Sequence, residues 1–207
     1  MKPKNARTIT EEVFNSVIHG LGVMAGVVGL FIGYITLAAP AAYKIGFLVY
    51  CTSLIMLMLA STLYHALTFT RARKVFSILD HSSIYLLIAG SFTPFAIKLF
   101  SGWGLALLLV AIWAFAILGV VTKAALPGFA KKIGVVPYII FGWVGLIFIP
   151  KMHLIQAAAI NLLIIGGVLY TIGVVLLVSK KPFMHAGWHV FVVAAAVAHF
   201  VAIIKLA

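Results

Sequence analysis

The chain has 207 residues, of which 65% are hydrophobic and only 9% are charged, against roughly 25% charged residues in an ordinary soluble domain. Its mean hydropathy of +1.24 excludes a water-soluble globular protein and indicates one that resides in a membrane. The formal net charge of +12 does not indicate nucleic-acid binding, because the Lys and Arg residues lie at the ends of apolar runs and form no basic face with interleaved aromatic residues. Anionic lipid headgroups are the expected counter-ions.

A basic segment opens the chain, and we predict that residues 1–16 are cytoplasmic and precede a first transmembrane helix at residues 17–39. The basic start imitates a cleavable signal peptide, but the apolar run of about 20 residues exceeds the roughly 7 to 15 of a signal h-region, so we expect the helix to be retained. One face of this helix carries a glycine stripe, formed by Gly22, Gly26, Gly29 and Gly33. Such a stripe suits either close packing inside a bundle or a dimer contact.

Six further apolar segments are long enough to cross a bilayer core of about 30 Å. We place them at residues 45–69, 77–97, 103–124, 133–150, 154–178 and 184–206. Pro137 falls in the first turn of the fifth of the seven helices, Pro150 should end it, and Pro94 should kink or end the third. The connections are too short for a second domain. The predicted fold is therefore all-α, with residues 1–207 forming a single bundle of seven transmembrane helices.

The basic residues predict the orientation of this bundle. One side holds eleven of them in its terminal segment and loops: Lys2, Lys4, Arg7, Arg71, Arg73, Lys74, Lys123, Lys131, Lys132, Lys180 and Lys181. The other side holds four: Lys44, Lys98, Lys151 and Lys205. Because short cytoplasmic loops retain Lys and Arg, the N-terminus is predicted to be cytoplasmic and the C-terminus outside.

Four ionisable residues from three different helices fall at the same depth, near the cytoplasmic face. His65 lies near the end of the second helix, Asp80 opens the third, and His185 and His189 open the seventh. Their separation along the chain is too large for this agreement to arise from sequence proximity, so we predict a shared site. His185 and His189 lie one turn apart, with Cβ atoms about 5 to 6 Å apart, which suits one metal ion, although hydrogen bonds or headgroups would also satisfy an isolated pair.

The type of site follows from the residue types. Asp80 costs about 2.5 to 3.5 kcal/mol inside a membrane on insertion scales, so it should pair with a cation, a metal or a metal-bound water. Three imidazoles with one carboxylate match a catalytic zinc site better than a structural one, because catalytic sites keep three protein ligands and one open position. Asp80 would then take a proton from the zinc-bound water or hold that water for attack on a carbonyl, which is hydrolytic chemistry. Imidazole also suits copper, iron and nickel, so spacing alone leaves the metal open.

Other polar residues fall near this site. Ser61 lies one turn before His65, which places its hydroxyl near the imidazole. Glu12, Asn15 and His19 share one face at the inner end of the first helix. This second group either lines the same cavity or forms an interfacial helix start with acidic residues that favour the helix dipole.

Three histidines and the single cysteine are not predicted to bind the metal. His81 points about 100° away from Asp80 around its helix, and His153 and His199 fall toward the outer half of the membrane. Cys51 lies inside an apolar run, where we expect a structural role, and a single cysteine excludes an intramolecular disulfide.

Over its whole length the sequence resembles the hemolysin III family of bacterial membrane proteins, relatives of the progestin and adiponectin receptor family. The resemblance rests on Glu11, Glu12, Asn15 and His19, on Ser61-Thr62-Leu63-Tyr64-His65, on Leu79-Asp80-His81-Ser82, on Ala89-Gly90-Ser91-Phe92-Thr93-Pro94 and on His185-Ala186-Gly187-Trp188-His189. It implies zinc as the metal, His65, His185 and His189 as its ligands, and a zinc-bound water engaged by Asp80. Ser61 matches the serine that the family carries one turn before its first histidine. The resemblance also implies the bacterial inner membrane as the location.

The resemblance leaves several functions open, because a shared fold and site do not fix an activity. The wider superfamily includes ceramidases, which implies a zinc-dependent hydrolase of a lipid amide or ester with Asp80 and Ser61 as catalytic residues. The alternative is a non-catalytic, receptor-like regulator or sensor of membrane lipid homeostasis. Cytolysis, which the family name suggests, is disfavoured because all seven predicted helices already reside in the membrane. A membrane lipid is the expected substrate or ligand.

Overall fold

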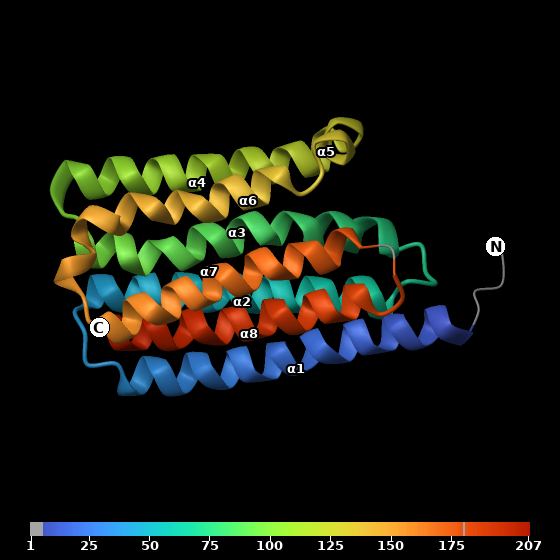
Figure 1. The fold of residues 1–207 in the computed structure, drawn as a ribbon, viewed down its shortest axis with the longest axis horizontal. Helices are drawn as coiled ribbons and strands as arrows, with labels where there is room; N and C mark the ends of the chain where they lie inside the picture. The colour runs from blue at the N-terminus through green and yellow to red at the C-terminus, as the bar shows by residue number, and fades with distance from the viewer. Residues whose placement is uncertain (1–5, 180) are drawn as a thin grey trace.

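The computed structural model describes residues 6–179 and 181–207, and over these residues the chain is an all-helical bundle (Figure 1). In chain order its elements are α1 Ala6–Thr36, α2 Ala41–Ala66, α3 Arg73–Leu99, α4 Gly102–Ala125, α5 Pro127–Ile133, α6 Val136–Trp143, the 3₁₀ helix η1 Val144–Leu154, α7 Ala157–Val178 and α8 Met184–Leu206. Seven spans in the described residues are long and apolar enough to cross a membrane, with α6 and η1 forming one span together. The predicted all-α membrane bundle is confirmed. Helices are the expected solution, because backbone groups in hydrocarbon have no water to bond.

The first helix is longer than predicted. It begins at Ala6 rather than at residue 17, so most of the segment predicted as residues 1–16 is helical and continuous with the span, while residues 1–5 lie outside the described residues. Glu11 and Glu12 fall in the segment that was predicted to precede the span, and carboxylates are costly inside a membrane helix. Both carboxylates have partners, Glu12 on His65 and Glu11 on the exposed Phe183 N–H, and the helix does not stop at them.

Prolines end fewer helices than predicted. Pro137 lies in the first turn of α6 as expected, but η1 continues through Pro150 to Leu154, and α3 continues through Pro94 to Leu99. Gly46 of α2 lies against Pro94 so closely that a Cβ added at Gly46 would come within 3.2 Å of the Pro94 Cα. Close packing of α2 against α3 thus supports the helix across its proline, as neighbouring helices do in membrane bundles.

The helices run back and forth, so that the loops gather at two ends. The end where α1 begins also carries the α2–α3 connection, α5 and the α7–α8 connection (Figure 1). We call it the basic end, because the described members of the eleven-residue basic set lie there; Lys2, Lys4 and Lys180 are outside the described residues. The other four basic residues lie at or near the opposite end. The basic residues that alternate between connections along the sequence therefore gather at one end of the bundle. Which end faces the cytoplasm stays a prediction.

The glycine stripe of α1 packs inside the bundle. Each of its four glycines lies against a side chain of α2 or α8. The pairs are Gly22 with Met58, Gly26 with Ile55, Gly29 with Phe200 and Gly33 with Phe47. A methyl group at any of them would press on that neighbour. Small residues allow α1 to approach both helices closely, which places its polar face against them.

Two buried tyrosines connect α2 to α8. The Tyr43 hydroxyl donates to the Ile203 carbonyl and the Tyr50 hydroxyl donates to the Ala196 carbonyl, both at 2.7 Å. Interhelical hydrogen bonds in membranes contribute about 0.6 kcal/mol each on average. These bonds fix the relative position of the two helices that carry the histidines.

Candidate metal centre

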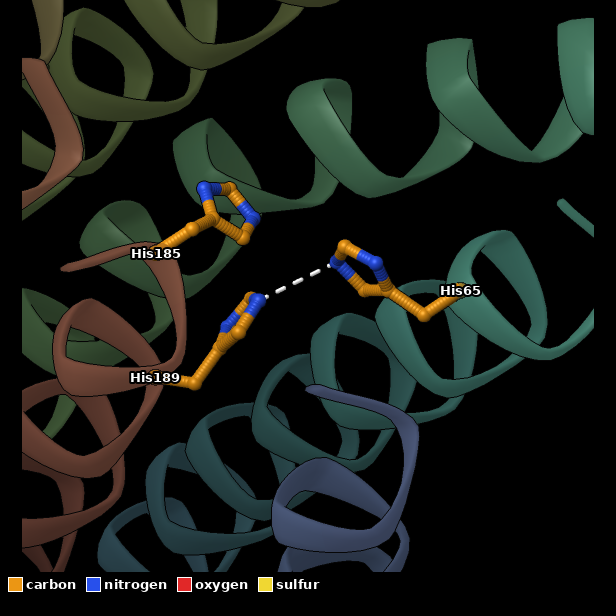
Figure 2. A group of neighbouring side chains, drawn as sticks. All are labelled: His65, His185 and His189. Atoms are coloured by element: carbon orange, nitrogen blue, oxygen red, sulfur yellow. Dashed lines mark hydrogen bonds between the residues drawn. The ribbon is translucent and has the colours of Figure 1, made fainter. Parts of the chain in front are cut away.

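Three histidines meet at the basic end of the bundle (Figure 2). His65 comes from the last turn of α2, and His185 and His189 come from the first turns of α8. One ligand atom from each lies within 4.8 Å of the other two, which is close enough for the group to hold a metal ion. His65 and His189 are buried, with 4% and 2% of their surface exposed, and His185 is partly exposed. The centre therefore has a closed inner side and a more open side at His185.

One pair of ring nitrogens has nearly the spacing found at a tetrahedral ion. The Nε2 atoms of His65 and His189 lie 3.1 Å apart, the contact drawn as a dashed line in Figure 2. Zinc binds imidazole at about 2.0 to 2.1 Å, so two ligand nitrogens at a tetrahedral ion lie about 3.3 Å apart. The ring centroid of His185 lies 4.6 Å from that of His189 and 5.2 Å from that of His65. The three rings thus surround a space of the size that one small ion needs.

A carboxylate holds the outer nitrogen of His65. Glu12 Oε2 lies 2.6 Å from His65 Nδ1, and because a carboxylate only accepts, Nδ1 carries the proton and Nε2 keeps its lone pair toward the centre. Thr68 Oγ1 donates to the other Glu12 oxygen at 3.2 Å, and Arg73 Nη2 lies 4.0 Å from it. A carboxylate in this position fixes the tautomer and the orientation of a metal-binding histidine.

The outer nitrogen of His189 is held as well. His19 Nε2 lies 3.0 Å from His189 Nδ1, and the two rings are edge-on with centroids 4.0 Å apart. Asn15 Nδ2 lies 3.4 Å from His65 Nδ1. The residues of α1 that were predicted to line the site thus contact the outer nitrogens of two of its histidines. Their common helical face was the only signal in the sequence, and it did not indicate which histidine each would meet.

Asp80 and Ser61 lie beside the centre without joining the group of three histidines. Asp80 Oδ2 is 3.7 Å from His81 Nδ1, while that same nitrogen lies 2.7 Å from the Ser77 carbonyl. Ser61 is fully buried next to Asp80, and its hydroxyl has no hydrogen-bond partner in the described part of the chain. An unpaired buried hydroxyl costs about 1 to 3 kcal/mol, so a water or another polar group bonded to it would be stabilising.

The remaining histidines lie outside the metal-binding group, as does the cysteine. His81 faces its own helix backbone, and His153 is exposed near the opposite end. His199 is buried, with Nε2 lying 3.3 Å from the Leu163 carbonyl. Cys51 is a buried free thiol. None of the four belongs to the group that could hold a metal among the described residues.

An apolar cavity of about 190 Å³ lies between α3, α6, η1, α7 and α8. Its inner wall includes Leu57, Ile84 and Trp188, which lie one turn before Ser61, one turn after Asp80 and beside His189. On the α6 and α7 side its lining includes Trp143 and Ile164, which are 45% and 53% exposed. The lining therefore combines sequence neighbours of the site residues with residues that are exposed on the outer surface of the bundle.

The sequence is similar to known proteins along nearly its whole length. A sequence model of a family described as "Haemolysin-III related" matches residues 7–200. Over 200 residues the chain is 35% identical to "Hemolysin-3 homolog" of Bacillus subtilis (strain 168), covering 93% of this chain and 92% of that protein. "Hemolysin-3" of Bacillus cereus is 37% identical over 191 residues, with coverage of 89% and 86%. "Monocyte to macrophage differentiation factor" of Homo sapiens is 27% identical over 213 residues, with coverage of 98% and 88%.

Proposed function

The chain belongs to the haemolysin-III related family of multi-pass membrane proteins, and from this premise we propose that it binds zinc through His65, His185 and His189 and hydrolyses an amide or ester bond of a membrane lipid. One observation carries the proposal: the bundle holds a group of three histidines and an apolar cavity whose lining includes Trp188, the sequence neighbour of His189. A lipid chain in the cavity would bring the polar end of the molecule to the histidines.

Zinc fits the residues that are present. Three imidazoles without a thiolate are the ligand set of catalytic zinc, which leaves one position for water or substrate. When bound, zinc supplies a Lewis acid and lowers the pKa of a bound water to about 7. Glu12 and His19 hold two of the three imidazoles by their outer nitrogens, which supports a preorganised site.

Asp80 is proposed as the group that takes the proton during hydrolysis. Its carboxylate lies near His65, Ser61 and His81. Glu12 is unavailable for this role because His65 and Thr68 already occupy both of its oxygens. The unpaired hydroxyl of Ser61 would orient the same water or the carbonyl of the substrate.

A second candidate function rests on a different observation. Glu12 of α1 contacts His65 of α2, and His19 of α1 contacts His189 of α8. These polar contacts join three helices at the metal centre. In a non-catalytic sensor, metal would lock α1, α2 and α8 together and lipid occupancy of the cavity would change their packing. Lysis is not proposed, because the seven spans are already suited to permanent residence in a membrane.

Hydrolysis is tested with purified protein in nanodiscs, a panel of ceramides, other N-acyl lipids and phospholipids, and mass-spectrometric detection of released fatty acid. We expect zinc-loaded wild-type protein to release fatty acid from at least one class. Asp80→Asn should keep its zinc and lose at least about 100-fold in rate, the lower range for a general base. His153→Ala serves as the control. Zinc without release across the panel would favour the sensor.

A further inference from the structure

Two polar side chains meet in the cavity far from the histidine centre. Tyr170 of α7 and His199 of α8 both line it, with ring centroids 5.5 Å apart and rings nearly perpendicular at 70°. The Tyr170 hydroxyl and the Nδ1 of His199 are both buried, and neither has a hydrogen-bond partner within residues 6–179 and 181–207. His199 as a whole is only 6% exposed. Two unpaired polar atoms at one place in an apolar bundle are costly unless something else bonds them.

The chemistry of the missing partner follows from the two atoms. His199 Nε2 lies 3.3 Å from the Leu163 carbonyl, which only accepts, so Nε2 carries the proton and Nδ1 is an acceptor. The Tyr170 hydroxyl is free to donate. A group that satisfies both atoms must therefore accept one hydrogen bond and donate another. A hydroxyl does this, whereas a carboxylate or a ketone can only accept.

On the side that faces Gly166, packing leaves room for the His199 ring and for little else. Gly166 of α7 lies directly against its imidazole, and a Cβ at Gly166 would collide with the ring edge that carries Nε2. The glycine thus allows α7 and α8 to close on the imidazole and keeps Nε2 directed to Leu163. The acceptor nitrogen is on the other edge of the ring.

The position of the pair relative to the histidine centre is set by α8. His199 follows His189 by ten residues on one helix, which is a distance of about 15 Å. An extended chain advances about 1.2 Å per bond, so this distance corresponds to roughly a dozen bonds. Between the two points the cavity is lined by apolar side chains such as Ile88 and Val192.

We propose that Tyr170 and His199 form a second subsite, which binds a hydroxyl group in the middle of the hydrocarbon chain of a lipid whose polar end lies at the histidine centre. The inference rests on the proposed function, because it takes the cavity as the place where the lipid binds. The inference adds a substrate class to the proposed function, namely amides or esters of fatty acids that are hydroxylated near the middle of the chain. A water molecule would also satisfy both atoms, and the experiment separates the two cases.

The test compares N-stearoylethanolamine with N-(12-hydroxystearoyl)ethanolamine in nanodiscs, with affinity read from tryptophan fluorescence, since Trp143 and Trp188 line the cavity. Wild-type protein should bind the hydroxylated compound about tenfold more tightly, because leaving buried polar groups unpaired weakens binding. Tyr170→Phe should remove this preference by weakening binding of the hydroxylated compound more than binding of the stearoyl compound. Gly166→Ala, which displaces the imidazole, should act in the same direction. Tyr34→Phe, at an exposed tyrosine, is the control.

Each other outcome overturns the inference in a distinct way. Equal affinity of wild-type protein for the two compounds would contradict the hydroxyl subsite and leave the proposed hydrolase intact. Equal weakening of both compounds in Tyr170→Phe would assign the two atoms to a structural water. Failure of wild-type protein to bind either compound would contradict both the subsite and the cavity as a lipid site.

Discussion

At the basic end, the buried histidines of α2 and α8 have direct contacts with side chains of α1. Glu12 contacts His65, and His19 contacts His189. On the other side of α3, the cavity next to α6, η1 and α7 leaves Tyr170 and His199 with unpaired atoms. The first region is a polar network in which His65 and His189 have side-chain partners, while Asn15 Oδ1, His19 Nδ1 and the Ser61 hydroxyl have none in the described part of the chain. The second is an apolar space in which the Tyr170 hydroxyl and His199 Nδ1 have no partner among the described residues.

The helices explain this difference. The glycine stripe and the tyrosines of α2 bring α1, α2 and α8 close together. On the cavity side, α6 continues as a 3₁₀ helix, and Gly142 and Gly167 have open space where a side chain would be. Tight packing is what a metal site requires, because its ligands must stay within a few tenths of an ångström, whereas a lipid site needs room.

The largest expected effect removes a metal ligand from the tight region. His65→Ala or His189→Ala should reduce bound zinc from about one per chain to nearly none, because two imidazoles leave a buried ion with too few ligands. Plasma mass spectrometry of the purified variants measures this. The exposed His153→Ala should retain the wild-type content. Unchanged zinc in His65→Ala and His189→Ala would exclude these residues as ligands.

A weaker effect is expected from the carboxylate behind His65. Glu12→Gln keeps the size of the side chain but removes the charge that orients the imidazole, and it should lower zinc affinity about 10- to 100-fold. Competition with a fluorescent chelator gives the affinity. Glu11→Gln is the matched control, because the Glu11 carboxylate accepts from the Phe183 N–H and not from a histidine. Equal affinities of the two variants would show that Glu12 does not act through His65.

The cavity region is tested by filling it. Gly167→Val places a side chain into the open space of the cavity lining and should weaken binding of a lipid chain about tenfold, while zinc content stays unchanged. Gly104→Val makes the same change at an exposed glycine of α4 that also has open space around it. Nanodisc binding of N-stearoylethanolamine compares the two. A loss of zinc in Gly167→Val would mean that the two regions are not separate.

The smallest effect is expected at the α2–α8 connection. Tyr43→Phe removes one interhelical hydrogen bond and should lower the free energy of unfolding by about 0.6 kcal/mol, and by no more than about 1.7. Thermal unfolding in detergent, with Tyr34→Phe as the control, measures the change. A larger loss accompanied by loss of zinc would show that this bond positions the histidines more strongly than its own energy suggests.

Much of the fold could be predicted because hydrocarbon leaves few choices. The last helix was predicted at residues 184–206 and lies at Met184–Leu206, since charged residues and Pro182 mark its start. The start of α1 and the passage of η1 through Pro150 were predicted wrongly. In both places tertiary partners override a local signal: the carboxylate of Glu12 is paired inside the bundle, and η1 is packed against α3.

Part of the candidate site could likewise be predicted from the sequence, and part could not. The common depth of His65, His185 and His189 was sufficient to predict that they meet, because helical spacing and alternation fix depth. The contacts of Glu12 and His19 with particular ring nitrogens depend on how α1 is rotated against α2 and α8, which the sequence does not specify. The sequence gives the depth of His199 in the membrane. It does not show that His199 lines a cavity, because a cavity depends on how the side chains of several helices pack.

X-ray absorption at the zinc edge of purified wild-type protein tests the central claim most directly. The account predicts one zinc per chain with three imidazole nitrogens and one oxygen at about 2.0 to 2.1 Å. A spectrum without imidazole scattering, or protein that binds no stoichiometric metal after incubation with zinc, would contradict it.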